Sequence, residues 1–171
     1  GMCSAHISYS YLGAVLAEKH DADLVAYRPR NINRLARLTR PSLFLWERLV
    51  SLVYKSFGVR ALVTPSISKI QQVRADKIFR RAVASMATTR DVEELEIEGC
   101  WLGDLIYDSY LMTYKVPTVH VSGDHFRVFL KQALELFVFW DDFFRKNMVS
   151  AINVSHCVYL NAMPLRIAIQ R

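Results

Sequence analysis

The sequence predicts an α/β protein with a Rossmann-like architecture, that is, an open, mainly parallel sheet with helices on both faces. Helical and extended segments alternate along the chain, which is the pattern of parallel strands joined by helices. The 171 residues are 52% hydrophobic, enough for the core of one domain. No apolar run reaches the length of a membrane span. We therefore expect a single domain over residues 2–171, with its first strand missing or truncated, because a helix precedes the first predicted strand.

Short apolar runs that end at turn residues predict the strands. They are residues 24–27, before Arg28-Pro29, residues 59–64, before Pro65, and residues 150–156. Residues 116–121 are expected to be extended, although Pro117 argues against a central strand, and an acidic connector over residues 91–98 is expected to hold a short strand. Apolar residues at helical spacing, with capping residues ahead of them, predict the helices. These are residues 7–19, 31–39, 43–57, 69–88, about 102–114, 126–146 and 159–171.

Residues 99–114 gather a tryptophan, three tyrosines and two carboxylates in one short stretch. On a helix, Asp104 and Asp108 are four residues apart and share a face, with Tyr107 beside them. Two like charges at this spacing repel each other by about a few tenths of a kcal/mol. We interpret this face as one that meets a polar or cationic group. The alternative is a solvated face with Asp104 near the helix start, where a carboxylate suits the helix dipole.

The positive charge of the chain is concentrated in one segment. The net charge is +6, and between Arg28 and Arg60 the only acidic residue is Glu47. Such a segment can contact phosphates, an anionic membrane surface or nucleic acid, and Arg28 and Arg30 are its candidates for substrate binding. We expect no nucleic-acid partner, because no motif of a nucleic-acid-binding module is visible. The alternative is again a solvated helix face.

Polar residues follow the last predicted strand, and ligands of open parallel sheets bind at the carboxyl ends of the strands. This strand ends at Ser155 and His156, with Tyr159 at the start of the next helix. His156 can act there as a base, or bind an anion together with the helix N-terminus. A histidine bonded to a backbone carbonyl is an equal alternative. His6, just ahead of the first predicted helix, is expected at the same edge of the sheet.

The sequence lacks the motifs of a self-sufficient active site. It contains no Gly-rich phosphate loop, no GxSxG elbow and no zinc-binding pair of histidines. The three cysteines, Cys3, Cys100 and Cys157, are widely spaced and odd in number. This spacing argues against disulfides and against a zinc site, and indicates a reducing compartment. We expect no metal in this chain.

Two segments carry a pair of motifs, GDLIYDSYL at residues 103–111 and VSHCVYLNAMPLRIAIQR at residues 154–171. Together they resemble motifs of bacterial surface-carbohydrate biosynthesis proteins, the capsular-polysaccharide and glycosyltransferase-like group. In that family the first motif reads approximately G-D-L-I-Y-D-S/T-Y-L-R. The second is a strand that ends in S-H, followed by V-Y and R-x-A-x-x-x-G. Met112 stands where a basic residue is common, and the family's glycine would fall just beyond Arg171.

The resemblance implies the N-terminal, acceptor-side half of a two-domain GT-B-type glycosyltransferase, at the cytoplasmic face of the inner membrane. It implies that this half binds a lipid-linked or glycan acceptor, and that a second domain binds the nucleotide-sugar donor. The candidates for the base are His156, His6, Asp104 and Asp108, and those for acceptor binding are Tyr107, Ser155, Tyr159, Arg28 and Arg30. The alternative is a non-catalytic, Rossmann-like binding or assembly module.

Overall fold

The computed structural model describes the backbone of residues 2–27, 51–154 and 157–171, and side chains from residue 7 onward within these ranges. The chain divides into two compact units, Gly1–Pro65 and Ser66–Arg171. Helices dominate the described residues, and strands occur only as two sheets of two short strands each. The prediction of a Rossmann-like, mainly parallel sheet covered by helices on both faces is therefore wrong. Within the described residues most of its local elements form, but they do not assemble around one sheet. The predicted helix over residues 31–39 and residues 43–50 of the predicted helix over 43–57 lie outside the described residues.

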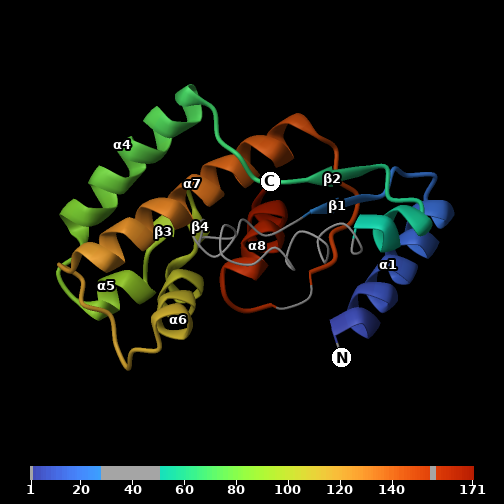
Figure 1. The fold of residues 1–171 in the computed structure, drawn as a ribbon. Coiled ribbons are helices and arrows are strands. Elements are labelled where there is room, and N and C mark those ends of the chain that lie inside the picture. The colour runs from blue at the N-terminus through green and yellow to red at the C-terminus, as the bar shows by residue number, and fades with distance from the viewer. Residues whose placement is uncertain (1, 28–50, 155–156) are drawn as a thin grey trace. The chain divides into compact units, whose positions relative to one another are not determined.

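The first unit contains a helix and a small parallel sheet (Figure 1). Helix α1 (Met2–Lys19) begins earlier than predicted and includes His6. Strands β1 (Val25–Tyr27) and β2 (Ala61–Val63) pair in parallel, with Val25 opposite Ala61. An ion pair lies next to this sheet, where the Arg60 Nη1 is 2.7 and 2.8 Å from the two carboxylate oxygens of Asp23. Residues 51–56 are helical.

The second unit begins with helix α4 (Lys69–Ser85), which is predicted correctly from its cap and its apolar spacing. Ser68 and Gln71 form a capping box at its start, which satisfies backbone N–H groups that the helix leaves free. The apolar spacing of α4 predicts that Ile70, Val73, Ile78 and Val83 face inward, and this is only partly correct. Ile78 is buried, but Ile70 and Val73 are 84% and 67% exposed.

A short helix and a hairpin connect α4 to the next long helix. Helix α5 (Thr89–Glu93) precedes the antiparallel strands β3 (Glu96–Ile97) and β4 (Cys100–Trp101). Glu98 and Gly99 both have positive φ, as the two central residues of a tight hairpin turn of type I′ require. Helix α6 (Gly103–Tyr114) then begins almost where the sequence predicts it.

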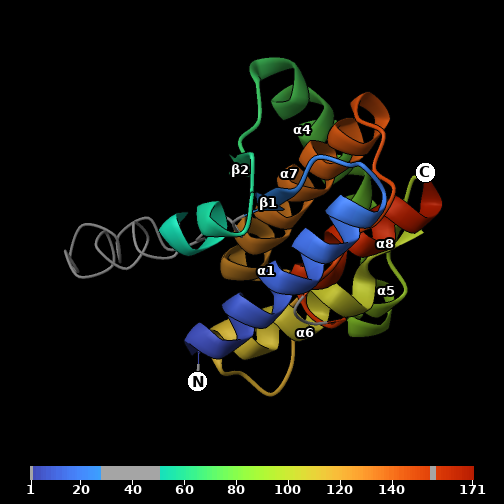
Figure 2. The same cartoon turned by 90° about the vertical axis from the view of Figure 1, so that its right-hand side faces the viewer.

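Helix α7 (Asp124–Lys146) is the centre of the second unit. It packs against α4, α6 and α8 (Met163–Gln170), so that one apolar face is buried along most of its length. Figure 1 shows α7 alongside α4, and Figure 2 shows α5 lying beside α6. The fully buried side chains of the core include Phe126, Phe129, Leu130, Leu134, Phe137 and Val138.

Two predicted extended segments form no strand. Residues 116–121 are a loop between α6 and α7, and residues 151–154 lie outside any strand, while residues 155–156 are outside the described part of the chain. The last predicted helix starts with a short 3₁₀ turn, η1 (Leu160–Ala162), and continues as α8 with Pro164 in its first turn. Since residues 151–154 form no strand, the part of the chain that the structure describes contains no sheet edge of the kind that the sequence predicts ahead of Tyr159.

Candidate functional site

The site is built on the N-terminal half of α6, and Gly103 explains how that helix lies against its neighbour. A Cβ atom at position 103 would lie 2.2 Å from the carbonyl oxygen of Val92 and 2.3 Å from that of Glu93. These distances are far below any tolerated contact, so only glycine lets α6 begin against the end of α5. The first residue of the GDLIYDSYL segment is therefore required by packing.

Asp104, in the first turn of α6, forms a bidentate ion pair with Arg166 of α8. The Arg166 Nη2 donates to Asp104 Oδ2 at 2.9 Å, and its Nη1 contacts Asp104 Oδ1. The same Nη1 donates to the carbonyl oxygen of Trp101 at 2.9 Å, and the guanidinium lies over the indole ring, 5.0 Å from its centroid. Both charged side chains are about one-quarter to one-third exposed. The sequence predicts a polar or cationic group near this face, and the structure shows that Asp104 is paired with Arg166.

The second contact between the two motif segments is made by Ser109. This side chain is buried, and its Oγ accepts a hydrogen bond of 2.7 Å from the backbone N–H of Leu160. The preceding residue, Tyr159, has φ 60° and ψ −177°, a conformation that a non-glycine residue adopts only when its surroundings enforce it. The hydrogen bond at Ser109 and the η1 turn that follows hold this strained residue beside α6.

Trp101 and Asp108 are the parts of this region that face solvent. The indole Nε1 of Trp101 donates to the carbonyl oxygen of Glu93 at 2.7 Å, which fixes the ring while the residue stays 48% exposed. Asp108 is exposed one turn after Asp104, and among the described residues it has no hydrogen-bond or ion-pair partner. Tyr107 between them is half-buried. We call this region, formed by Trp101, Asp104, Asp108 and Arg166, the α6 site.

The structure brings together only some of the residues that the sequence nominates. Asp104, Asp108 and Tyr107 lie on one helix, and Tyr159 is held near it through Leu160. The residues Ser155, His156, Arg28 and Arg30 lie outside the described part of the chain. His6 is within α1 rather than in a loop ahead of it, and it belongs to the Gly1–Pro65 unit. Its side chain is not among those that the structure describes.

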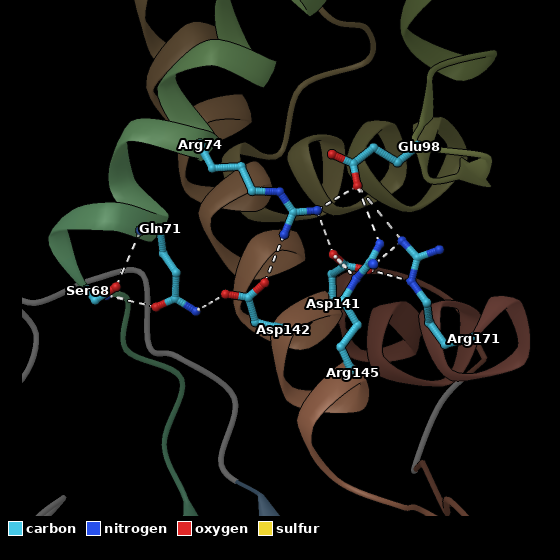
Figure 3. Close-up of polar contacts among 8 residues, drawn as sticks. All are labelled: Ser68, Gln71, Arg74, Glu98, Asp141, Asp142, Arg145 and Arg171. Atoms are coloured by element: carbon cyan, nitrogen blue, oxygen red, sulfur yellow. Dashed lines mark hydrogen bonds and ion pairs between the residues drawn. The ribbon is translucent and has the colours of Figure 1, made fainter.

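A cluster of charges that the sequence does not reveal lies between α4, the β3–β4 turn and the ends of α7 and α8 (Figure 3). Asp141 is fully buried and accepts hydrogen bonds from three arginines. Arg74 also donates to Glu98 at 2.5 Å and to Asp142 at 2.9 Å. The members of this charge cluster are Arg74, Arg145, Arg171, Glu98, Asp141 and Asp142.

Burial alone would raise the pKa of Asp141, but the hydrogen bonds from Arg74, Arg171 and Arg145 outweigh this and lower it. Three arginines face three carboxylates, so the charge cluster is neutral as a whole. Each arginine of the cluster is already paired with a carboxylate, so the cluster stabilises the packing of three helices and a turn. It is not a candidate for ligand binding.

Nothing in the described ranges resembles a metal centre, since no group of three or more metal-ligating side chains comes together there. Burial is the main reason that the pKa of the Cys100 thiol is raised, which keeps this cysteine protonated and unreactive. None of the helices in the described segments is both long and apolar enough to cross a membrane.

Comparison with known proteins gives no relative: no family model, no curated protein and no solved structure matches this chain. The α6 site and the motif resemblance of its two segments are therefore the remaining indications of function.

Proposed function

We propose that this chain binds the carbohydrate acceptor of a bacterial surface-polysaccharide glycosyltransferase, and that the α6 site makes this contact. The observation that carries the proposal is the direct pairing of the two motif segments. Asp104 pairs with Arg166, and Ser109 with Leu160, although about fifty to sixty residues separate the partners. Segments that resemble motifs of one family therefore support each other physically.

The chemistry of the exposed groups suits a sugar. A pyranose ring presents an apolar C–H face, which packs on an aromatic side chain, and hydroxyl groups, which donate to carboxylates. Trp101 offers a fixed, half-exposed indole, and Asp108 offers a carboxylate that is free of internal partners in the described structure. Asp104, in contrast, is held by Arg166 and serves to position this guanidinium over the indole.

In this proposal the chain binds the acceptor, and the nucleotide-sugar donor is bound by a second domain. The loss of the predicted Rossmann-like sheet removes the fold as an argument for a GT-B-type enzyme, so only the paired motifs and the α6 site support the assignment. Of the candidate bases, Asp108 is the one in the α6 site whose carboxylate is available to accept a proton from a sugar hydroxyl.

The test is a titration of the full chain with oligosaccharides, selected on a glycan array and measured by calorimetry. Asp108→Asn is the informative variant, because it keeps the shape and removes the charge. Hydrogen bonds to charged groups are worth about 1.5–3 kcal/mol, so we expect binding to weaken about tenfold or more. Asp124→Asn is the matched control, since Asp124 is an exposed carboxylate in the first turn of a different helix. Equal affinities for the Asp108→Asn variant and the wild type would refute the site.

The basic segment between Arg28 and Arg60 is the basis for a proposal about where the protein is located. We place the protein at the cytoplasmic face of the inner membrane, with the cations between Arg28 and Arg60 directed to anionic headgroups. Arg60 itself is engaged with Asp23, so the contribution would come from the remaining cations of the segment. Sedimentation with anionic vesicles, compared with neutral ones, tests this, and equal recovery in both would count against it.

A further inference from the structure

A second feature of the Ser66–Arg171 unit has no part in the α6 site. It is a hollow of about 490 Å³, within the range of about 300–1,000 Å³ that is typical of small-molecule sites. Its walls come from the end of α4, the turn before α5, the loop before α7 and the first turns of α7. The lining residues that matter here are Ala87, Val119, His120, Phe126, Arg127 and Leu130.

The floor of the hollow is apolar and well supported. Val119 is 4% exposed, Phe126 1%, and Leu130 is fully buried. The Phe126 ring packs edge-on against Tyr110, with their centroids 5.3 Å apart, so it is fixed by α6 from behind. Val83, Met86 and Val121 also line the hollow and are partly exposed. A ligand with an aromatic or aliphatic body that covers these three side chains removes apolar surface from water.

The polar groups of the lining point to a ligand with negative charge. Arg127 has no carboxylate partner anywhere in the described structure, in contrast to Arg74, Arg145, Arg166 and Arg171. His120 and Ser122 add two hydrogen-bonding groups, 3.4 Å apart, and no acidic side chain lines the hollow. Gly123, the N-cap of α7, provides no side chain that would satisfy the first N–H groups of that helix.

We propose that this hollow binds a small phosphate monoester with an apolar group. The phosphate would pair with the Arg127 guanidinium, whose planar fork matches phosphate oxygens. The free N–H groups at the start of α7 would add to the attraction, although the exposed Asp124 in the same turn reduces it. The apolar group would cover the partly exposed side chains of Val83, Met86 and Val121. This site is independent of the glycan proposal, since none of its lining residues belongs to the α6 site.

The experiment is an NMR titration of the isotope-labelled full chain with phenyl phosphate. We expect saturable shifts at the amides of residues that line the hollow. Arg127→Gln should weaken the affinity about tenfold, because a charge-assisted pair is lost. Arg80→Gln is the matched control, since Arg80 is an exposed arginine of α4 that does not line the hollow.

A second variant tests the hollow without removing any contact of the fold. Ala87 lies at the exposed rim, and only its backbone N–H is engaged, with Asp91. Ala87→Phe should therefore occlude the hollow and abolish the shifts while the protein stays folded. Phenol and inorganic phosphate, which each carry half of the proposed ligand, should bind more weakly than phenyl phosphate.

Three results would overturn the proposal: no saturable shift with phenyl phosphate in the millimolar range, equal affinity for the wild type and the Arg127→Gln variant, or equal binding of phenol. A lipid phosphate shares this chemistry, and vesicles that contain phosphatidic acid distinguish the two sources. Retention by these vesicles without any binding of phenyl phosphate would also overturn the assignment to a small molecule. These readouts are separate from glycan binding, so the two proposals can fail independently.

Discussion

The charge cluster around Asp141 allows the sharpest prediction about stability. Asp141→Asn keeps the shape of the side chain but removes a fully buried charge that three arginines share. Removing one partner of a buried ion pair costs about 3–5 kcal/mol. The arginines here are 21–53% exposed and keep Glu98 and Asp142 as partners. We therefore expect the lower end of that range, about 3 kcal/mol.

The magnitude can be checked by thermal and urea unfolding. For a unit of about one hundred residues, an entropy of unfolding near 0.2 kcal/mol/K converts a loss of about 3 kcal/mol into a fall in Tm of about 15 °C. Asp142→Asn is the control, because Asp142 is half-buried and bonds only Arg74 and Gln71 in the described structure. It should cost about 1 kcal/mol.

The pH dependence provides a second readout. The folded-state pKa of Asp141 is lowered, so the folded state binds this proton less readily than the unfolded state, in which the pKa is about 3.9. The stabilisation by Asp141 is fully present above this value and is lost as the pH falls through the folded-state pKa. The difference in unfolding free energy between the wild type and the Asp141→Asn variant should shrink below about pH 4. A difference that is the same at every pH, or that is below about 0.5 kcal/mol at neutral pH, would refute the reasoning.

Three further predictions concern the second unit. Gly103→Ala places a methyl group against the carbonyls of Val92 and Glu93, and should lower the free energy of unfolding by about 3 kcal/mol or more, as measured by urea unfolding; a loss below about 1 kcal/mol would show that α6 can shift. A double-mutant cycle of Asp104→Asn and Arg166→Gln should give a coupling energy of about 1 kcal/mol, because the pair is bidentate but partly exposed; a coupling of zero would contradict the pairing. Ser68→Ala removes one half of the capping box of α4 and should cost about 1 kcal/mol in thermal unfolding, whereas an unchanged Tm would show that the cap contributes nothing.

The local elements of this fold could be predicted because their signals are local. The start of α4 follows from a capping serine, and β1 and β2 follow from short apolar runs closed by proline. The sheet was predicted wrongly because strand pairing is a long-range property. The segments 116–121 and 151–154 look extended in sequence, but they find no partner strand in the described structure.

In the candidate site, too, local features could be predicted from the sequence, whereas long-range contacts could not. The spacing of Asp104 and Asp108 identifies one helix face, and a polar or cationic group beside it could be anticipated from the repulsion of the two charges. That this group is Arg166 could not be anticipated, because Arg166 is far away in sequence and reaches Asp104 only through the packing of α8. The charge cluster was missed for the same reason, since Arg74, Glu98 and Asp141 carry no spacing signal.

The central claim is that the α6 site contacts a glycan, and an NMR map of the labelled chain tests it most directly. The Trp101 indole N–H is fixed by its bond to Glu93 and should give a distinct resonance. With a glycan that the chain binds, the account predicts saturable shifts at this indole and at the amide of Asp108. Saturable shifts at other residues, with the Trp101 indole and Asp108 amide signals unchanged, would contradict it.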